Sequence, residues 1–303
     1  MPPPEARLRL SRRHFLALTG AAALSLPAPT AGAITTRPNA VFRWAKDEAQ
    51  FGGFSAIELS ADRTRALAFS DRGFAVRFNL LRDSAGRLTG IDEIEHFMPL
   101  DLSGSPLGES RADIEGMDQA PDGTLHLSFE GWRQSRVMRY ASDRSRPTAL
   151  SVAPSWQRMR TNQTLEALAV DADGTAFVIT ESAATAGFPI YRQSGDGWPI
   201  VAHLPRRGSF NPVGADFGPD GALYLLERKF RLAFFATRIS RILPGAWDRP
   251  QTLVETSYGL LDNHEGISIT RDAEGQIWAT TISDDNQNRF QRTEIAEFAL
   301  PPA

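Results

Sequence analysis

A short pattern recurs along this chain at almost regular intervals: a strand-like run, a tight turn that ends in glycine, and a second strand-like run. The turn glycines Gly123, Gly174, Gly221 and Gly275 are separated by 51, 47 and 54 residues. A weaker copy of the pattern surrounds Asp62. Repeats of this length made only of strands are typical of β-propellers, in which each repeat forms one blade. The repeat therefore predicts an all-β chain folded as a single propeller.

Two further strand-like segments follow most copies of the pattern, which gives four strands per blade. They are expected at 74–79 and 91–98, 136–140 and 148–152, 188–192 and 199–204, and 237–242 and 252–256. The last repeat has only one such segment, 293–299, whereas segment 40–45 has no partner nearby in sequence. We expect this N-terminal strand to close the last of five blades, because closure protects strand edges. A six-bladed ring is the alternative, since 60 residues separate Asp62 from Asp122.

Residues 1–33 have the features of a twin-arginine signal peptide. Arg12 and Arg13 precede Phe15, an apolar run covers 17–26, and small residues at 31–33 form a cleavage pattern. We expect the twin-arginine export machinery to deliver a mature domain, residues 34–303, to the periplasm or the outside of the cell. The apolar run is too short to cross a bilayer comfortably, so the mature protein is expected to have no membrane span.

Charge and cysteine content exclude several classes of function. The first 33 residues carry four arginines and one glutamate, so the rest of the chain has a net charge of −6, against −3 for the whole. An acidic domain argues against a nucleic-acid partner, which would require a basic face. The chain has no cysteine, which excludes disulfides, thiolate catalysis and cysteine zinc sites. No Gly-x-Ser-x-Gly motif supports a serine hydrolase of the α/β type.

Acidic residues recur at two fixed places in the repeat. The first strand begins with Glu115, Glu166 or Glu265, and Asp216 stands slightly displaced in the fourth blade. The second strand ends at Asp71, Glu130, Glu181, Glu227 or the pair Asp284 and Asp285. These two places share one face of a propeller, because the second strand runs antiparallel to the first. We expect the carboxylates to converge on one mouth of the central channel, where they would repel one another without a positive partner.

Three kinds of positive partner fit this pattern. A divalent cation such as calcium prefers many oxygen ligands. Arginines closely follow the acids, at Arg72, Arg133, Arg228 and Arg289, and could form ion pairs with them. A cationic ligand is the third. The acids could instead serve structure alone, by accepting backbone N–H bonds between blades. His264 adjoins Glu265 and is a candidate acid–base group or ligand.

These motifs resemble those of the phytase-like family, described as esterase-like activity of phytase and found in exported bacterial proteins. The matching segments are 52–55, 70–73, 113–116, 214–221 with 225–228, and 263–266 with 283–286 and 291–293. They lie within residues 50–298, nearly the whole expected mature chain. The third blade departs from the pattern, with Glu166-Ala167 where the other acidic strand starts have Glu-Gly.

The resemblance implies a propeller that hydrolyses a small-molecule ester or phosphate ester. In a calcium-assisted phosphomonoesterase, a metal would be held by Glu115, Glu166, Glu265, Asp284 and Asp285. Arg72 and Arg228 would bind phosphate oxygens. His264 is the third candidate catalytic residue. Two alternatives stay open: a non-enzymatic periplasmic propeller that binds a ligand or acts as a scaffold, and a calcium-dependent lactonase-like hydrolase.

Overall fold

A computed structural model describes residues 36–48, 51–108, 112–131, 135–159 and 164–302. The chain divides into two units, Met1–Ala33 and Ile34–Ala303. The first unit, which includes the expected signal peptide, lies outside the described residues. The second contains five four-stranded antiparallel sheets, and the one helical element described there is the short 3₁₀ turn η2 (Trp156–Arg158). No helix in the described ranges has the length and hydropathy needed to cross a membrane.

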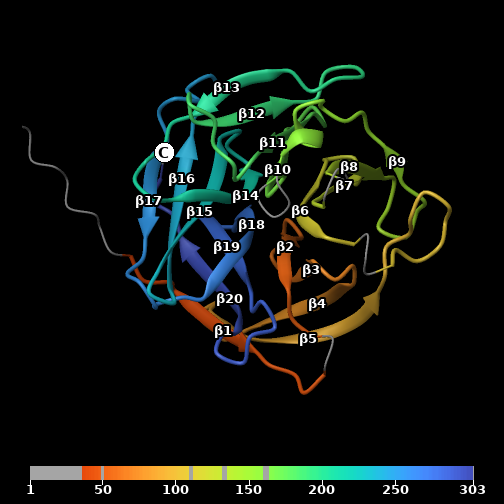
Figure 1. The fold of residues 1–303 in the computed structure, drawn as a ribbon. Coiled ribbons are helices and arrows are strands. Elements are labelled where there is room, and N and C mark those ends of the chain that lie inside the picture. Colours follow the sequence, from red (N-terminus) through yellow and green to blue (C-terminus); the bar gives the residue numbers. More distant parts are fainter. Residues whose placement is uncertain (1–35, 49–50, 109–111, 132–134, 160–163, 303) are drawn as a thin grey trace, which may run out of the picture. The chain divides into compact units, whose positions relative to one another are not determined.

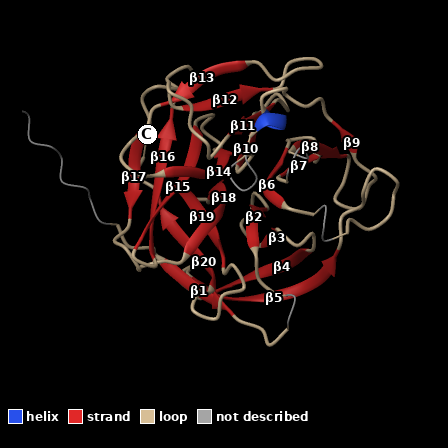
Figure 2. Cartoon of the chain, in the orientation of Figure 1, coloured by secondary structure: helices blue, strands red, loops and turns tan. Residues whose placement is uncertain are grey.

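The five sheets are the blades of a propeller, and their inner strands β2, β6, β10, β14 and β18 lie closest to its centre (Figure 1). Figure 2 shows that strands and loops make up nearly all of the described chain. The first two blades are β2 (Phe54–Leu59), β3 (Arg65–Ser70), β4 (Ala75–Arg82) and β5 (Leu88–Phe97), and β6 (Ile114–Gln119), β7 (Leu125–Phe129), β8 (Arg136–Tyr140) and β9 (Thr148–Ala149). The next two are β10 (Ala167–Val170), β11 (Ala176–Ile179), β12 (Phe188–Arg192) and β13 (Ile200–Leu204), and β14 (Asn211–Phe217), β15 (Leu223–Arg231), β16 (Phe234–Ile242) and β17 (Gln251–Glu255). The fifth contains β18 (Asn263–Arg271), β19 (Ile277–Asp284), β20 (Thr293–Ala299) and β1 (Ala40–Trp44).

The N-terminal strand closes the ring. Strand β1 pairs antiparallel with β20, from Ala40 opposite Glu297 to Trp44 opposite Thr293. Trp44 then stacks on Phe54 of the first blade, with 4.9 Å between ring centroids and 15° between planes. These contacts join the last blade to the first. The expectations of an all-β chain, five blades and closure by the N-terminal strand are confirmed, and the six-bladed alternative is wrong.

Hydrophobic clusters fill the spaces between neighbouring blades. The cluster between the fifth and first blades contains Trp44, Phe54 and Ile295, and the cluster between the first two contains Phe69 and Phe129. Similar clusters follow around the ring. Complete burial of one such side chain contributes about 1.5–3 kcal/mol, so the faces of the blades supply most of the stabilisation and leave the channel free for polar groups.

Each inner strand except β10 contains a β-bulge near its start. The extra residue is Ser55 in β2, Glu115 in β6, Val213 in β14 and Glu265 in β18. A bulge leaves its residue outside the regular alternation and redirects its side chain. In three of the four strands the next residue is glycine, and these glycines allow the inner strands to come unusually close.

The glycines close the channel. A Cβ on Gly214 would lie 2.3 Å from the carbonyl oxygen of Glu265, and one on Gly266 would lie 2.8 Å from Cα of Ala56. The remaining cavity on the axis is about 10 Å³, at the lower limit for one water molecule. The channel therefore has two separate ends. The first mouth is the end with Glu115, Glu166 and Glu265, and the second mouth is the opposite end.

Candidate functional site

The first mouth brings together acids from three blades. Glu115 and Glu265 occupy bulges in β6 and β18, and Glu166 directly precedes β10. All three line the narrow cavity on the axis. Burial raises the pKa of Glu115 well above its usual value, and the charges of Glu166 and Glu265 raise it further. The structure therefore brings together three of the five residues for which the sequence predicted a metal, the other two being Asp284 and Asp285.

Acids at the ends of the second strands surround this group. Burial, followed by the charge of Glu265, raises the pKa of Asp284 to about 8 and that of Asp71 to about 6. Glu130 acts in the same direction on Glu115 and Glu166. Such shifts mean that bringing all these carboxylates together in ionised form costs free energy. The first mouth therefore favours the binding of protons or cations, which reduce the repulsion between the carboxylates.

Arg228 supplies part of the missing positive charge. Its guanidinium forms an ion pair with Glu265, lies 3.5 Å from Oε1 of Glu181 and donates to Oδ1 of Asn263. Burial alone would lower its pKa, but the charges of Glu265 and Glu166 raise it instead. Asn263 also donates from Nδ2 to Oε1 of Glu265 over 2.9 Å, which fixes that carboxylate. An arginine, one of the three kinds of positive partner considered, is thus present at the first mouth.

One part of the mouth has a donor set suited to a hard cation. Asp113, Glu115 and Glu130 each offer a carboxylate oxygen, and these oxygens lie within 4.8 Å of one another. Burial raises the pKa of Asp113, so its ionised form is disfavoured here unless a cation is bound. Asp113 and Glu130 were not predicted as ligands. The sequence signal for them is that Asp113 directly precedes the first strand of the blade and Glu130 directly follows the second, close to Glu115.

Asp285 has another visible role. Its carboxylate accepts hydrogen bonds from Gly53 N at 3.1 Å, Gln287 N at 3.0 Å and Thr293 Oγ1 at 3.0 Å. A Cβ on Gly52 would lie 2.3 Å from Oδ1 of Asp285, so the glycine pair allows this approach. Asp285 therefore ties the loop after β19 to the entrance of the first blade.

His264 and Arg72 lie apart from the acids on the axis. His264 is fully buried within the fifth blade, where Nδ1 is 2.7 Å from Thr281 Oγ1 and Nε2 is 3.8 Å from Glu294 Oε2. Because the bulge falls on Glu265, the two neighbours face different surroundings. Arg72 lines a separate cavity of about 290 Å³, although its charge acts on adjacent Asp71.

Other acids of the repeat also differ from the expected pattern. Glu227 is buried in the fourth blade, where it accepts from Arg207, Arg238 and Ser240, so it stabilises that blade. Asp216 lies at the second mouth, because the bulge in β14 falls on Val213. Arg133, a candidate partner, lies outside the described residues. Arg289 lies over the ring of Phe290, with 4.7 Å between guanidinium carbon and ring centroid.

A comparison with protein families places these motifs in context. The family model described as "Phytase-like: Esterase-like activity of phytase" matches residues 49–287. The chain belongs to this family. All the acids of the first mouth lie inside the matched region. So do Arg72 and Arg228, the two arginines predicted to bind phosphate. The search of curated proteins found no match.

The comparison with solved structures found matches to this phytase-like protein at low sequence identity. A hypothetical protein from Leishmania major is 8% identical with a TM-score of 0.51, over 88% of this chain and 91% of that chain. An endo-arabinase from Bacteroides thetaiotaomicron is 12% identical with a TM-score of 0.49, over 89% of this chain and 99% of that chain. A gluconolactonase from Xanthomonas campestris is 13% identical with a TM-score of 0.45, over 82% of this chain and 72% of that chain. At these identities the first likeness shows the fold alone.

Proposed function

We propose that this phytase-like protein is an exported hydrolase that cleaves an ester or phosphate monoester at the first mouth, assisted by a divalent cation. The observation that carries the proposal is the convergence of buried carboxylates from several blades around Arg228. Such a cluster costs folding free energy, and clusters of strongly perturbed groups mark functional sites. The family match supports the reaction class, and the twin-arginine pattern supports a periplasmic or secreted location.

The donor set fits calcium. Calcium binds six to eight oxygen ligands and tolerates irregular geometry. Oxygens of Asp113, Glu115 and Glu130 already lie close enough together to share one ion. Glu166, Glu265 and Asp284 would complete the site, and Asp285 would hold its edge through Gly53. A bound cation would supply a Lewis acid for the phosphoryl or carbonyl oxygen and lower the pKa of a bound water.

The arginines would recognise the substrate. Arg228 keeps 22% of its side chain exposed while it holds Glu265, so donors remain for an anionic oxygen. Arg72, which follows the second strand of the first blade, would provide another contact at the rim. His264 acts in this proposal only from inside the blade, where its bond to Thr281 supports the strand that carries Glu265.

The test is an activity assay on purified residues 34–303. Phytate, an aryl phosphate, an aryl acetate and a lactone are each incubated with calcium and with a chelator. The variants are Glu115→Gln and Glu265→Gln, with Glu274→Gln as control because Glu274 is exposed in a turn. We expect chelator-sensitive turnover that falls at least about tenfold in both site variants and not in the control.

Each outcome of this assay assigns a class. Turnover of a phosphate or acetate ester supports the proposal, whereas a preference for the lactone favours a lactonase-like hydrolase. No turnover of any substrate by folded protein refutes the hydrolase. Retained calcium binding would then favour a binding or scaffold propeller.

A further inference from the structure

A second group of carboxylates lies at the opposite end of the channel. It consists of Glu58 from β2, Asp118 from β6 and Asp216 from β14. Each stands three residues after the bulge of its strand, so the three lie at the same height on the axis. One oxygen from each lies within 4.8 Å of the others.

Two of these carboxylates are held in place by neighbouring blades. Oδ2 of Asp118 accepts a hydrogen bond from Val170 N at 2.5 Å, and Oδ2 of Asp216 accepts one from Ile269 N at 2.5 Å. In the fifth blade Ser268 plays the same part, since its Oγ accepts from Leu59 N at 3.0 Å. These bonds fix the two aspartates, so their orientation does not depend on a ligand.

Glu58 differs, because one of its oxygens has nothing to bind. Oε2 of Glu58 is out of contact with solvent and has no hydrogen-bond partner among the described residues. A buried oxygen of this kind is costly unless something pairs with it. Burial raises the pKa of Glu58 well above its usual value, the charges of Asp216 and Asp118 raise it further, and a hydrogen bond with Ser268 opposes the shift.

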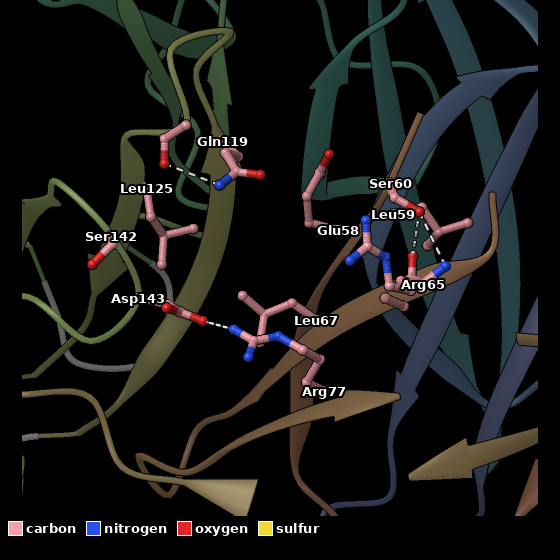
Figure 3. Close-up of a pocket in the computed structure, with 12 residues that line it drawn as sticks. Glu58, Leu59, Ser60, Arg65, Leu67, Arg77, Gln119, Leu125, Ser142 and Asp143 are labelled. Atoms are coloured by element: carbon pink, nitrogen blue, oxygen red, sulfur yellow. Dashed lines mark hydrogen bonds and ion pairs between the residues drawn. The ribbon is translucent and has the colours of Figure 1, made fainter. Parts of the chain in front are cut away.

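Two arginines line a pocket beside Glu58, but neither pairs with its carboxylate. Figure 3 shows Glu58 at the gap between the first two blades, with Arg65 and Arg77 along the same pocket. Arg77 pairs with Asp143 and with Glu95. Arg65 makes no ion pair with Glu58 in the described structure. No described residue therefore gives the second mouth a cation comparable to Arg228 at the first.

A cavity of about 520 Å³ opens onto the same three carboxylates. Its rim carries Asp171 and Asp173, and its wall includes Phe217 and Trp247. The described residues that line it include no lysine, arginine or histidine. The cavity gives ions and water access to the carboxylates from solvent. The closed channel keeps this end separate from the first mouth.

We propose that Glu58, Asp118 and Asp216 form a second divalent-cation site, of the calcium class, at the second mouth. Two oxygens that each lie about 2.4 Å from one ion can be at most about 4.8 Å apart, which the three carboxylates satisfy. The ion would pair with the orphaned Oε2 of Glu58 and offset two of the three negative charges of the carboxylates. Water from the cavity completes the coordination shell. This site is independent of the reaction proposed at the first mouth.

The test counts bound calcium. Chelator-treated residues 34–303 are titrated with calcium chloride in a calorimeter, as wild type and as Glu58→Gln, Asp118→Asn and Asp216→Asn. Asp118→Asn and Asp216→Asn each keep one oxygen that can accept from Val170 N or Ile269 N, and Glu58→Gln affects neither of these bonds. Glu115→Gln serves as the matched variant of the first mouth. We expect each variant of the second mouth to lose one calcium ion per chain, or at least tenfold in affinity for it, while Glu115→Gln retains that ion.

A luminescence measurement provides an independent readout. Terbium replaces calcium and is excited through Trp247, which lines the cavity. We expect Trp247→Phe to reduce the sensitised emission without changing the number of calcium ions. The proposal is overturned if the folded variants of the second mouth bind as much calcium as wild type. It is also overturned if wild type binds no calcium at the second mouth and the only effect of Asp216→Asn is a more stable protein. Neither result depends on whether the protein hydrolyses a substrate.

Discussion

Replacement of Gly214 by alanine tests whether contact between inner strands closes the channel. The new Cβ would lie 2.3 Å from the carbonyl oxygen of Glu265 and 3.3 Å from Cγ2 of Ile267. Insertion of a methyl group into a well-packed interior costs about 1–3 kcal/mol, and a backbone obstacle places this case near the upper value. Domains of similar size change in Tm by about 2–4 °C per kcal/mol. We therefore expect Gly214→Ala to lower the Tm by about 6–12 °C.

Gly90 offers a matched control within a strand. A Cβ there would meet Leu81 Cδ1 at 3.6 Å, an ordinary contact, and the backbone is not left-handed. Gly90→Ala should be neutral or stabilise by about 0.4–1 kcal/mol, because alanine restricts the unfolded chain. Calorimetry and urea unfolding of both variants, in chelator, measure the difference. Equal Tm values for the two variants would refute the close approach of β14 and β18.

Three further predictions concern other parts of the propeller. Glu227→Gln should cost about 3–5 kcal/mol in urea unfolding, because it leaves the buried Arg238 and the partly buried Arg207 without their carboxylate. A loss equal to that of Glu274→Gln would contradict this. Burial lowers the pKa of His126 to about 4, so the stability it contributes is present above about pH 6.5 and is lost as the pH falls towards 4. Wild type should lose about 3 kcal/mol more than His126→Gln over that range, and parallel pH profiles would disprove the buried neutral histidine. Calcium at about 100 times its Kd should stabilise chelator-treated protein by about 2.7 kcal/mol per site, and an unchanged Tm would rule out tight binding to the folded state.

The fold was predictable because its signals are local. Four of the five blades repeat a turn in which an acidic side chain accepts backbone N–H bonds and a glycine adopts a positive φ. At Gly174, for example, φ is +77°, and Asp171 accepts from the N–H groups of Asp173 and Thr175. The unpaired N-terminal strand and the incomplete last blade then left one arrangement that protects both edges. The strand count and the closure followed from these two facts.

The site was only partly predictable, because a single extra residue decides which way a side chain faces. A shift of one residue exchanges the two faces of a strand. The bulge at Glu265 turns that residue to the first mouth and leaves His264 inside the blade. In β14 the bulge falls on Val213, and Asp216, three residues further along, lies at the second mouth. Hydrophobic periodicity does not reveal bulges, so these assignments needed the structure.

The second mouth had a sequence signal of a different kind. Asp118 and Asp216 each lie five residues before a turn glycine, and Glu58 lies five residues before Arg63. Arg63 takes the place of that glycine, with φ of +60°. Its guanidinium bonds to Glu297 at 3.0 Å, which accounts for an arginine at a position that favours glycine. If the repeats are aligned with Arg63 in the place of the turn glycine, the three acids fall at the same position of the repeat.

The pairing of β1 with β20 also sets an order of events during folding. These are the first and last strands of the propeller to be synthesised, and Ala40 meets Glu297 across almost the whole chain. Contacts between residues so distant in sequence form slowly and late. The first four blades can assemble while the ribosome is still working, but the fifth has to wait for the final strand. Completion of the ring therefore reports that synthesis has continued at least as far as β20.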